Sequence, residues 1–190
     1  SFPTRRSSDL FDFQTNIIPH FTVYGTFFLD ELRFGELFND WWANKHGVQL
    51  GARFSHDFFS LPSDWQAEAT FLRPWTYTHK FFINNYTSNG ICLGFPHAGN
   101  SRFYELTNTT RFNRRTQMTL NYSFLKHGED TETEYFGGDP RVSYDLRNQN
   151  LDNATKWLMG DIRTSKYLSA QIKYEVYNDA YLRFEITQYL

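Results

Sequence analysis

The sequence predicts an all-β protein, specifically an antiparallel transmembrane β-barrel. Aromatic residues make up 19% of the chain, yet its mean hydropathy is −0.60. That combination is typical of apolar and polar residues that alternate along strands and do not gather in helical cores. Several segments alternate with a period of two, and the gaps between them are in turn long and short.

The first ten residues, SFPTRRSSDL, are expected to be foreign to the fold. They show no apolar periodicity and lack the apolar core of a signal peptide. They resemble translated sequencing-adapter read-through. The folded domain is therefore expected to cover residues 11–190.

Seven segments then carry one mostly apolar and one mostly polar face, as strands do. In the first, Tyr24 and Phe28 interrupt the polar face. In the third, Arg73 interrupts an apolar face that is expected to continue to Trp75 and Tyr77. The seven expected strands cover residues 21–29, 48–54, 65–77, 103–112, 117–124, 157–176 and 182–186.

The connections favour a transmembrane barrel over the alternative, a β-sandwich or jelly roll with a dry interior. Successive connections of an antiparallel meander lie at opposite ends of the sheet, so all the long ones are expected at one end. Outer-membrane barrels have this asymmetry, with long extracellular loops and short periplasmic turns. If the long and short connections lie at opposite ends, residues 157–176 must form one unbroken strand. The long gaps are 35–46, 78–102 and 127–155, and the short ones are 60–64, 113–115 and 177–179.

Seven strands is an odd number, whereas single-chain bacterial barrels close with an even number from eight upwards. Residues 11–190 are therefore expected to be a partial outer-membrane β-barrel domain. The formal net charge of −2 argues against a nucleic-acid partner. The single Cys92 excludes an intrachain disulfide and a zinc cluster of cysteines. No apolar run approaches the roughly 20 residues of a transmembrane helix.

Five strings resemble a known family when taken in order: YGTFFLDELRF (24–34), WWANKHGVQLGARF (41–54), RPWTYTH (73–79), NYTSNGICLGFPHAGNS (85–101) and YFGGDP (135–140). They resemble the Wzi-like capsule assembly proteins of Bacteroidota, including gliding-motility-associated members. Those carry strings such as YGQFLLDE, WxNKxxxQLG, RPYTYSH and NYxHYxxPLxHPxGxN. This chain departs from the last string at Ser88, Cys92 and Phe95. The resemblance implies an outer-membrane β-barrel that binds, attaches or helps assemble surface polysaccharide, with outer-membrane lipid around it.

The segment 73–101 is expected to be a long extracellular loop whose flat rings and amide groups suit hydroxyl-rich sugar. Trp41 and Trp42 in the first long loop are expected at the same end. The alternative for the aromatic residues is a girdle at the membrane interface, with proline and glycine shaping a plug-like loop. The candidate carbohydrate-binding residues are Trp41, Trp42, Trp75, Tyr77, His79, Asn85, Tyr86, His97 and Asn100.

Catalytic and metal signals are weak. The six histidines form no HExxH motif, and no GxSxG motif is present. An acidic cluster at Glu129, Asp130, Glu132 and Glu134 could hold calcium through oxygen ligands. The calcium-loop signature is absent, so a solvated acidic loop is favoured. We expect a non-catalytic protein without a metal site or cofactor. A general diffusion channel and a barrel-embedded hydrolase are the alternatives, and the sequence indicates no oligomeric state.

Overall fold

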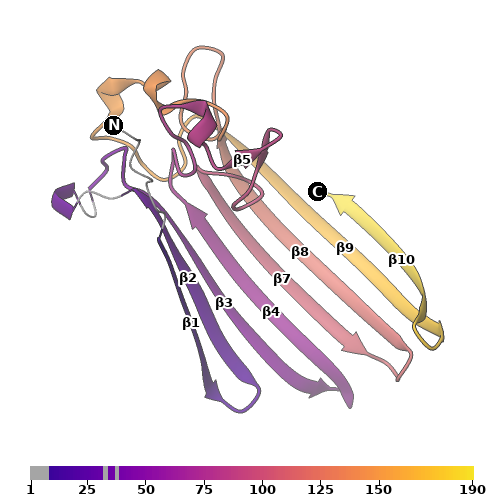
Figure 1. Cartoon of the computed structure of the whole chain (residues 1–190). Coiled ribbons are helices and arrows are strands. Elements are labelled where there is room, and N and C mark those ends of the chain that lie inside the picture. The colour runs from indigo at the N-terminus through magenta and orange to yellow at the C-terminus, as the bar shows by residue number, and fades with distance from the viewer. Residues whose placement is uncertain (1–8, 32–33, 37–38) are drawn as a thin grey trace.

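The computed structural model describes residues 9–31, 34–36 and 39–190. Its main element is one eight-stranded antiparallel sheet in which every strand pairs with its neighbours along the chain (Figure 1). The strands are β1 (Asp9–Ile18), β2 (Phe21–Glu31), β3 (Lys45–Phe58), β4 (Leu61–Leu72), β7 (Ser101–Arg111), β8 (Thr116–Glu129), β9 (Asp161–Tyr177) and β10 (Ala180–Tyr189). The predicted all-β antiparallel fold is confirmed.

The connections hold the remaining elements. A small hairpin of β5 (Thr87–Ser88) and β6 (Ile91–Cys92) lies between β4 and β7. It is the only other sheet within the described residues, so the packed pair of sheets of a sandwich is not found there. Four single-turn 3₁₀ helices complete the described elements: η1 (Phe34–Glu36), η2 (Phe82–Asn84), η3 (Tyr144–Leu146) and η4 (Gln149–Leu151).

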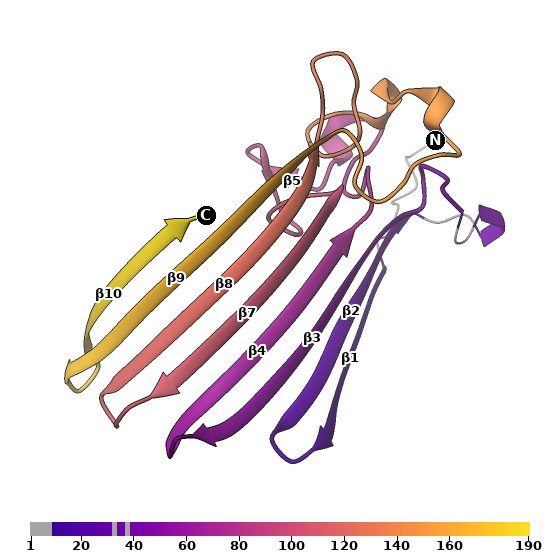
Figure 2. The same cartoon turned by 180° about the vertical axis from the view of Figure 1, so that it is seen from behind.

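The long and short connections lie at opposite ends of the sheet, as the sequence predicted. The long ones follow β2, β4 and β8, and they gather at one end, which we call the loop end (Figure 1). Tight turns follow β1, β3, β7 and β9 at the other end, which we call the turn end. Figure 2 shows the same separation from behind.

The predicted number of strands was wrong by one, because β1 was missed. Its sequence alternates, with Phe11 and Phe13 on one side and Asp12 and Gln14 on the other. The strand begins at Asp9, inside the segment that was set aside as foreign, and it pairs along β2. Residues 1–8 lie outside the described residues, so the adapter origin of the segment stays a prediction.

Two other strand boundaries also needed correction. β4 ends at Leu72, because Trp75 and Tyr77 have φ angles of 65° and 74°, which no strand residue adopts. They form a turn instead of continuing the apolar face. β9 is one unbroken strand of 17 residues, as the loop sorting required, although it starts at Asp161 and not at residue 157.

The register places the apolar positions of all eight strands on one surface, because directly opposed residues share a face. Phe54 lies opposite Trp65, Ala67 opposite Leu106, and Leu106 opposite Tyr122. We call this surface the apolar face. It comprises Phe11, Phe13, Phe27, Val48, Leu50, Ala52, Phe54, Trp65, Ala67, Ala69, Phe71, Tyr104, Leu106, Leu120, Tyr122, Phe124, Leu168, Ala170, Ile172, Phe184 and Ile186.

The opposite surface, the polar face, carries a network of hydrogen-bonded side chains. Asn121 donates to Glu105 Oε1 over 2.7 Å and to Thr107 Oγ1 over 2.8 Å. The Tyr24 hydroxyl donates to the Glu68 carboxylate. These bonds link β2 to β4 and β7 to β8, and they satisfy polar groups that face one another across the strands.

The two faces differ in exposure. On β9, Leu168, Ile172 and Val176 are 43%, 45% and 49% exposed, while the polar residues between them are partly covered. Side chains crowd together on the concave side of a curved sheet and spread apart on its convex side. The sheet therefore curves toward its polar face, and its apolar face is the convex one.

The best-buried part of the described chain lies in the connections and not on the sheet. The side chains with almost no exposure belong to the loop end or to the first residues of the adjoining strands. A water-soluble sandwich would instead bury its apolar strand residues. The residues concerned are Asn44, Lys45, Pro74, Thr76, Thr78, Asn100 and Ser101.

Candidate functional site at the loop end

The three long connections are joined into one body, which we call the loop assembly (residues 39–44, 73–100 and 130–160). Arg73, directly after β4, donates from Nη2 to the carbonyl oxygens of Trp41 at 3.2 Å and Thr155 at 2.9 Å. Burial lowers the pKa of its guanidinium, and the Asp40 carboxylate opposes that shift. A single buried cation thus ties the first and third connections to the second.

Lys45 provides a second tie. Its side chain is 0% exposed, and its Nζ donates to Glu31 Oε2 and to the Thr78 carbonyl, both at 2.9 Å. The ammonium also lies 4.3 Å from the centre of the Tyr144 ring and 5.3 Å from that of Trp42. A buried charge requires such pairing. Lys45 therefore belongs to the interior of the loop end and does not extend to its surface.

Asn100 joins the second and third connections to β8. Its Nδ2 donates to the carbonyls of Gly128 and Met159, both at 2.9 Å, and its Oδ1 accepts from the Met159 amide at 3.0 Å. Gly128 is required for this approach, because a Cβ there would collide with both Asn100 and the Met159 carbonyl. All three bonds end on backbone atoms, so Asn100 acts as a structural clamp.

Four of the nine candidate sugar-binding residues are buried in the loop assembly, and this corrects the expectation that they offer open faces. Trp75 is 3% and Tyr77 5% exposed; Asn85 and Asn100 are 6% and 0% exposed. The Trp75 ring packs against Gly137, where a Cβ would clash with it. Tyr77 stacks on Tyr86 at 5.7 Å, and its hydroxyl accepts from the Phe95 amide at 3.2 Å.

The other five candidates retain accessible surface. Tyr86 is 46% exposed, on the side away from Tyr77. Trp41 and Trp42 lie against each other with ring centres 6.1 Å apart, and the Arg147 guanidinium lies 3.8 Å from the centre of the Trp42 ring. His79 Nε2 is 3.6 Å from an Asp30 oxygen. His97 lies elsewhere, against Phe103. The nine residues therefore do not converge on one site.

A pocket of about 750 Å³ lies on the polar face where the sheet meets the loop assembly. β8 and β9 form one wall, and two stretches of the connections, 90–98 and 135–142, form the other. Of the nine candidate sugar-binding residues, His97 alone lines this pocket. The wall residues with polar or aromatic side chains include His127, Glu129, Asp130, Tyr135, Asp139, Arg141, Arg163 and Tyr167.

Two ion pairs lie in this pocket. Arg141 contacts Asp139 through both Nε and Nη2, the latter at 2.6 Å, and Arg163 contacts Glu129 at 3.1 Å. The Arg141 hydrogen bonds hold the pKa of Asp139 below its ordinary value. Both guanidinium groups are more than half exposed, so they keep donors for a ligand.

Burial shifts the pKa values of two further groups in the pocket, His97 and Asp130. Burial lowers the pKa of His97, and the neighbouring His127 lowers it further, so the His97 ring is neutral at pH 7. A neutral imidazole offers one donor and one acceptor. Burial also raises the pKa of Asp130, although the amides of Phe136 and Gly138 oppose that shift. The pocket is thus rich in donors and acceptors and carries little net charge.

The sequence contained a partial signal for this pocket. His127 and Arg163 lie directly opposite each other and extend the polar faces of two predicted strands toward the loop end. Asp139 and Arg141 belong to the turn-forming string GGDPR. Their distance from His97 along the chain concealed the common site. The acidic cluster does not converge: Glu129 pairs with Arg163, and Glu134 accepts from Asn148.

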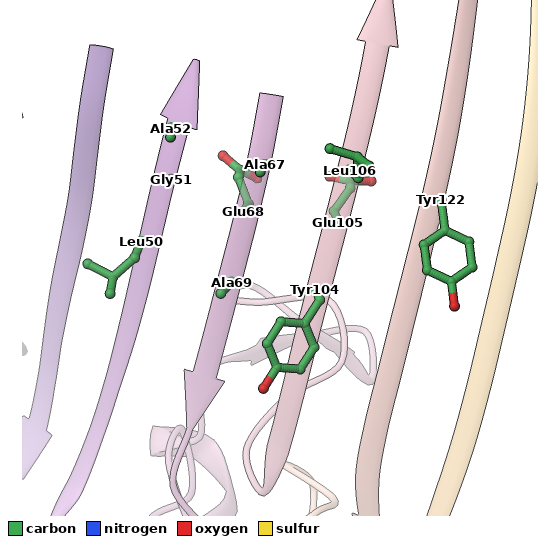
Figure 3. A pocket seen from close by; sticks show the side chains of 10 residues that line it. All are labelled: Leu50, Gly51, Ala52, Ala67, Glu68, Ala69, Tyr104, Glu105, Leu106 and Tyr122. Atoms are coloured by element: carbon green, nitrogen blue, oxygen red, sulfur yellow. The ribbon is translucent and has the colours of Figure 1, made fainter. Parts of the chain in front are cut away.

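The apolar face has a shallow groove of its own, of about 470 Å³. Figure 3 shows Ala67 and Ala69 of β4 between Leu50 of β3 and Tyr104 of β7. The groove exists because alanine side chains alternate with large ones across adjacent strands. We call it the alanine groove.

Among the described residues, no helix has the length and apolarity that crossing a membrane requires. Comparisons with models of known families, with curated proteins and with solved structures find no match for this chain. The fold and the site thus define the protein structurally: a meandering antiparallel sheet with one apolar face, a closed loop assembly and a polar pocket.

Proposed function

We propose that the chain is part of an outer-membrane β-barrel that binds surface polysaccharide, or helps to assemble it, without catalysis. The sheet supports the first half of this proposal. Eight strands place their apolar residues on the convex face and their polar residues on the concave face. Lipid-facing apolar residues and a polar interior are the arrangement of transmembrane barrels.

The pocket on the polar face is the observation that carries the second half. In the proposed barrel it opens into the mouth at the extracellular end. Its guanidinium donors, carboxylate acceptors and neutral His97 match the mixed hydrogen-bonding needs of sugar hydroxyls. The ring of Tyr135 offers an apolar face of the kind that packs on a pyranose. The motif resemblance points to the same class of ligand.

The test takes surface polysaccharide from the cells that make the protein and measures how tightly the folded protein binds it. Tyr135→Ala and Arg141→Gln should each weaken binding about ten-fold, which corresponds to the loss of roughly 1.4 kcal/mol of contact. Tyr177→Ala is the matched control, because Tyr177 is 74% exposed at the turn end. Its binding should equal that of the wild type.

Binding must be expressed per folded molecule, because the variants could also change the amount of folded protein. Unchanged binding in both pocket variants would overturn the assignment of the pocket. Conductance in planar bilayers addresses the diffusion-channel alternative. The loop assembly lies at the end that would form the mouth, so we expect little current from the intact protein.

A further inference from the structure

Three basic residues form a cluster on the apolar face, near its loop end. Arg102 of β7 lies directly opposite Lys126 of β8. Lys166 of β9 lies opposite Phe124, which places it diagonally beside Lys126. We call Arg102, Lys126 and Lys166 the basic patch.

The part of the chain that the structure describes supplies no ion-pair partner for this patch. Like charges directly opposite each other destabilise a pair of strands. Yet the ion pairs found within the described part of the chain include none of the three residues. Arg102 Nε is shielded from solvent and has no hydrogen-bond partner in that part either. By contrast, Arg111 and Arg163 on the polar face each have a carboxylate partner.

Aromatic rings lie next to the patch. Tyr104 and Phe124 are two residues nearer the turn end than Arg102 and Lys126, and Phe71 lies directly opposite Arg102. Phe71, Tyr104 and Phe124 form a row across β4, β7 and β8, with successive ring centres 5.6 Å and 6.1 Å apart. Lys126 Nζ lies 5.8 Å from the centre of the Phe124 ring. Apolar residues continue beyond the row toward the turn end, including Leu106, Leu120 and Tyr122.

Apolar side chains toward the turn end, followed by rings and cations together near the loop end, match the arrangement found at a membrane surface. Aromatic rings occupy the headgroup level there, and basic residues attract anionic headgroups. The alanine groove begins beside Tyr104, where Ala69 is its direct cross-strand partner (Figure 3). An apolar chain that extends from the patch toward the turn end would therefore meet the alanine groove.

We propose that the basic patch binds the phosphate group of an anionic lipid in the leaflet at the loop end, with an acyl chain of that lipid lying along the alanine groove. The proposal rests on the membrane location proposed above. The phosphate supplies the missing counter-charge for Arg102, Lys126 and Lys166. Arginine and lysine together suit this ligand, because a guanidinium binds phosphate oxygens in a bidentate manner and an ammonium adds charge.

The test uses the folded protein in vesicles of phosphatidylcholine alone and in vesicles that also contain phosphatidylglycerol. Native mass spectrometry after gentle extraction measures how much of each lipid the protein retains. The wild type should retain phosphatidylglycerol preferentially. The double variant Arg102→Gln/Lys126→Gln should reduce that preference about five-fold for each cation removed.

The matched control is Lys173→Gln/Arg183→Gln. These two cations also oppose each other directly across a strand pair, but on the polar face. The control should keep the preference of the wild type. Equal losses in the two double variants would overturn the proposal, as would a wild type without preference. Displacement of the lipid by inorganic phosphate would show a simple anion site instead of a lipid site, and would overturn it too.

Insertion is measured separately by protection from added protease. A protein that inserts but shows no lipid preference contradicts the basic patch alone. A protein that does not insert contradicts both this proposal and the proposed barrel. The two failures are therefore distinguishable.

Discussion

Asn100 is the residue on which two connections and β8 converge. Its side chain is fully buried, and all three of its hydrogen bonds reach backbone atoms far along the chain. An asparagine suits this position because it offers donors and an acceptor from one flat group. Three other candidate sugar-binding residues, Trp75, Tyr77 and Asn85, are also buried in the loop assembly.

Asn100→Ala should destabilise the protein by about 3 kcal/mol, because it leaves the Gly128 and Met159 backbone groups buried without partners. Equilibrium unfolding in detergent micelles measures the change in the free energy of unfolding. Asn153→Ala is the control, since Asn153 is exposed in the same assembly. A loss below about 1 kcal/mol for Asn100→Ala would mean that the clamp contributes little.

β9 shows the division between the two faces most clearly among the strands. Of its 17 residues, those from Asp161 to Tyr174 pair with β8 without a bulge. Ile172 on the apolar face lies between Met118 of β8 and Phe184 of β10. Gln171 on the polar face donates to Glu185 over 3.2 Å. Adjacent residues of one strand thus occupy opposite environments.

In the proposed barrel, Ile172→Arg places a charge in lipid and should cost roughly 2 to 4 kcal/mol near the bilayer midplane. Gln171→Arg places the same side chain in the polar interior, beside Glu185, and should cost much less. Folding titrations in lipid vesicles compare the two variants directly. Equal costs would reject the assignment of the faces to lipid and interior.

The strand pattern was predictable because alternation is a local property. Residues 117–124 and 168–176 show it within the sequence itself, and gap lengths alone correctly placed the long connections at one end. β1 was missed although only its first two residues lie in the segment that was set aside. Its alternation at Phe11 and Phe13 was present in the sequence.

The interior of the loop assembly was not predictable, because contacts across long separations determine it. Trp75 adopts a φ of 65° where its backbone amide bonds to the Gly137 carbonyl at 3.2 Å. A period-two reading continues the strand through that position. The pocket was concealed for the same reason, since His97, Arg141 and Arg163 meet only after the second and third long connections have folded against β9.

The molecule as a whole places its tightest packing at one end and a broad apolar surface along its length. Soluble monomers rarely expose contiguous apolar patches beyond a few hundred Å². Here large apolar side chains on all eight strands are exposed together, among them Phe11, Leu50, Leu106, Ile172 and Phe184. The surroundings of the sheet must therefore cover this face, and lipid does so in the proposed barrel.

The loop assembly also determines the order in which the protein can fold. Each strand of the main sheet pairs with the next strand of that sheet along the chain, and the hairpins closed by the tight turns at the turn end need only short closures. The assembly instead needs the Arg73 contact to Thr155, across 82 residues. We expect pulsed hydrogen exchange during refolding to protect the amides in the middle of β7 and β8 before those of Asn100 and Gly128, which bond to carbonyls of the loop assembly. Simultaneous protection would contradict this order.

A nascent protein would thus pass through a stage with a formed sheet and an open end, when proteases and chaperones have access to the connections.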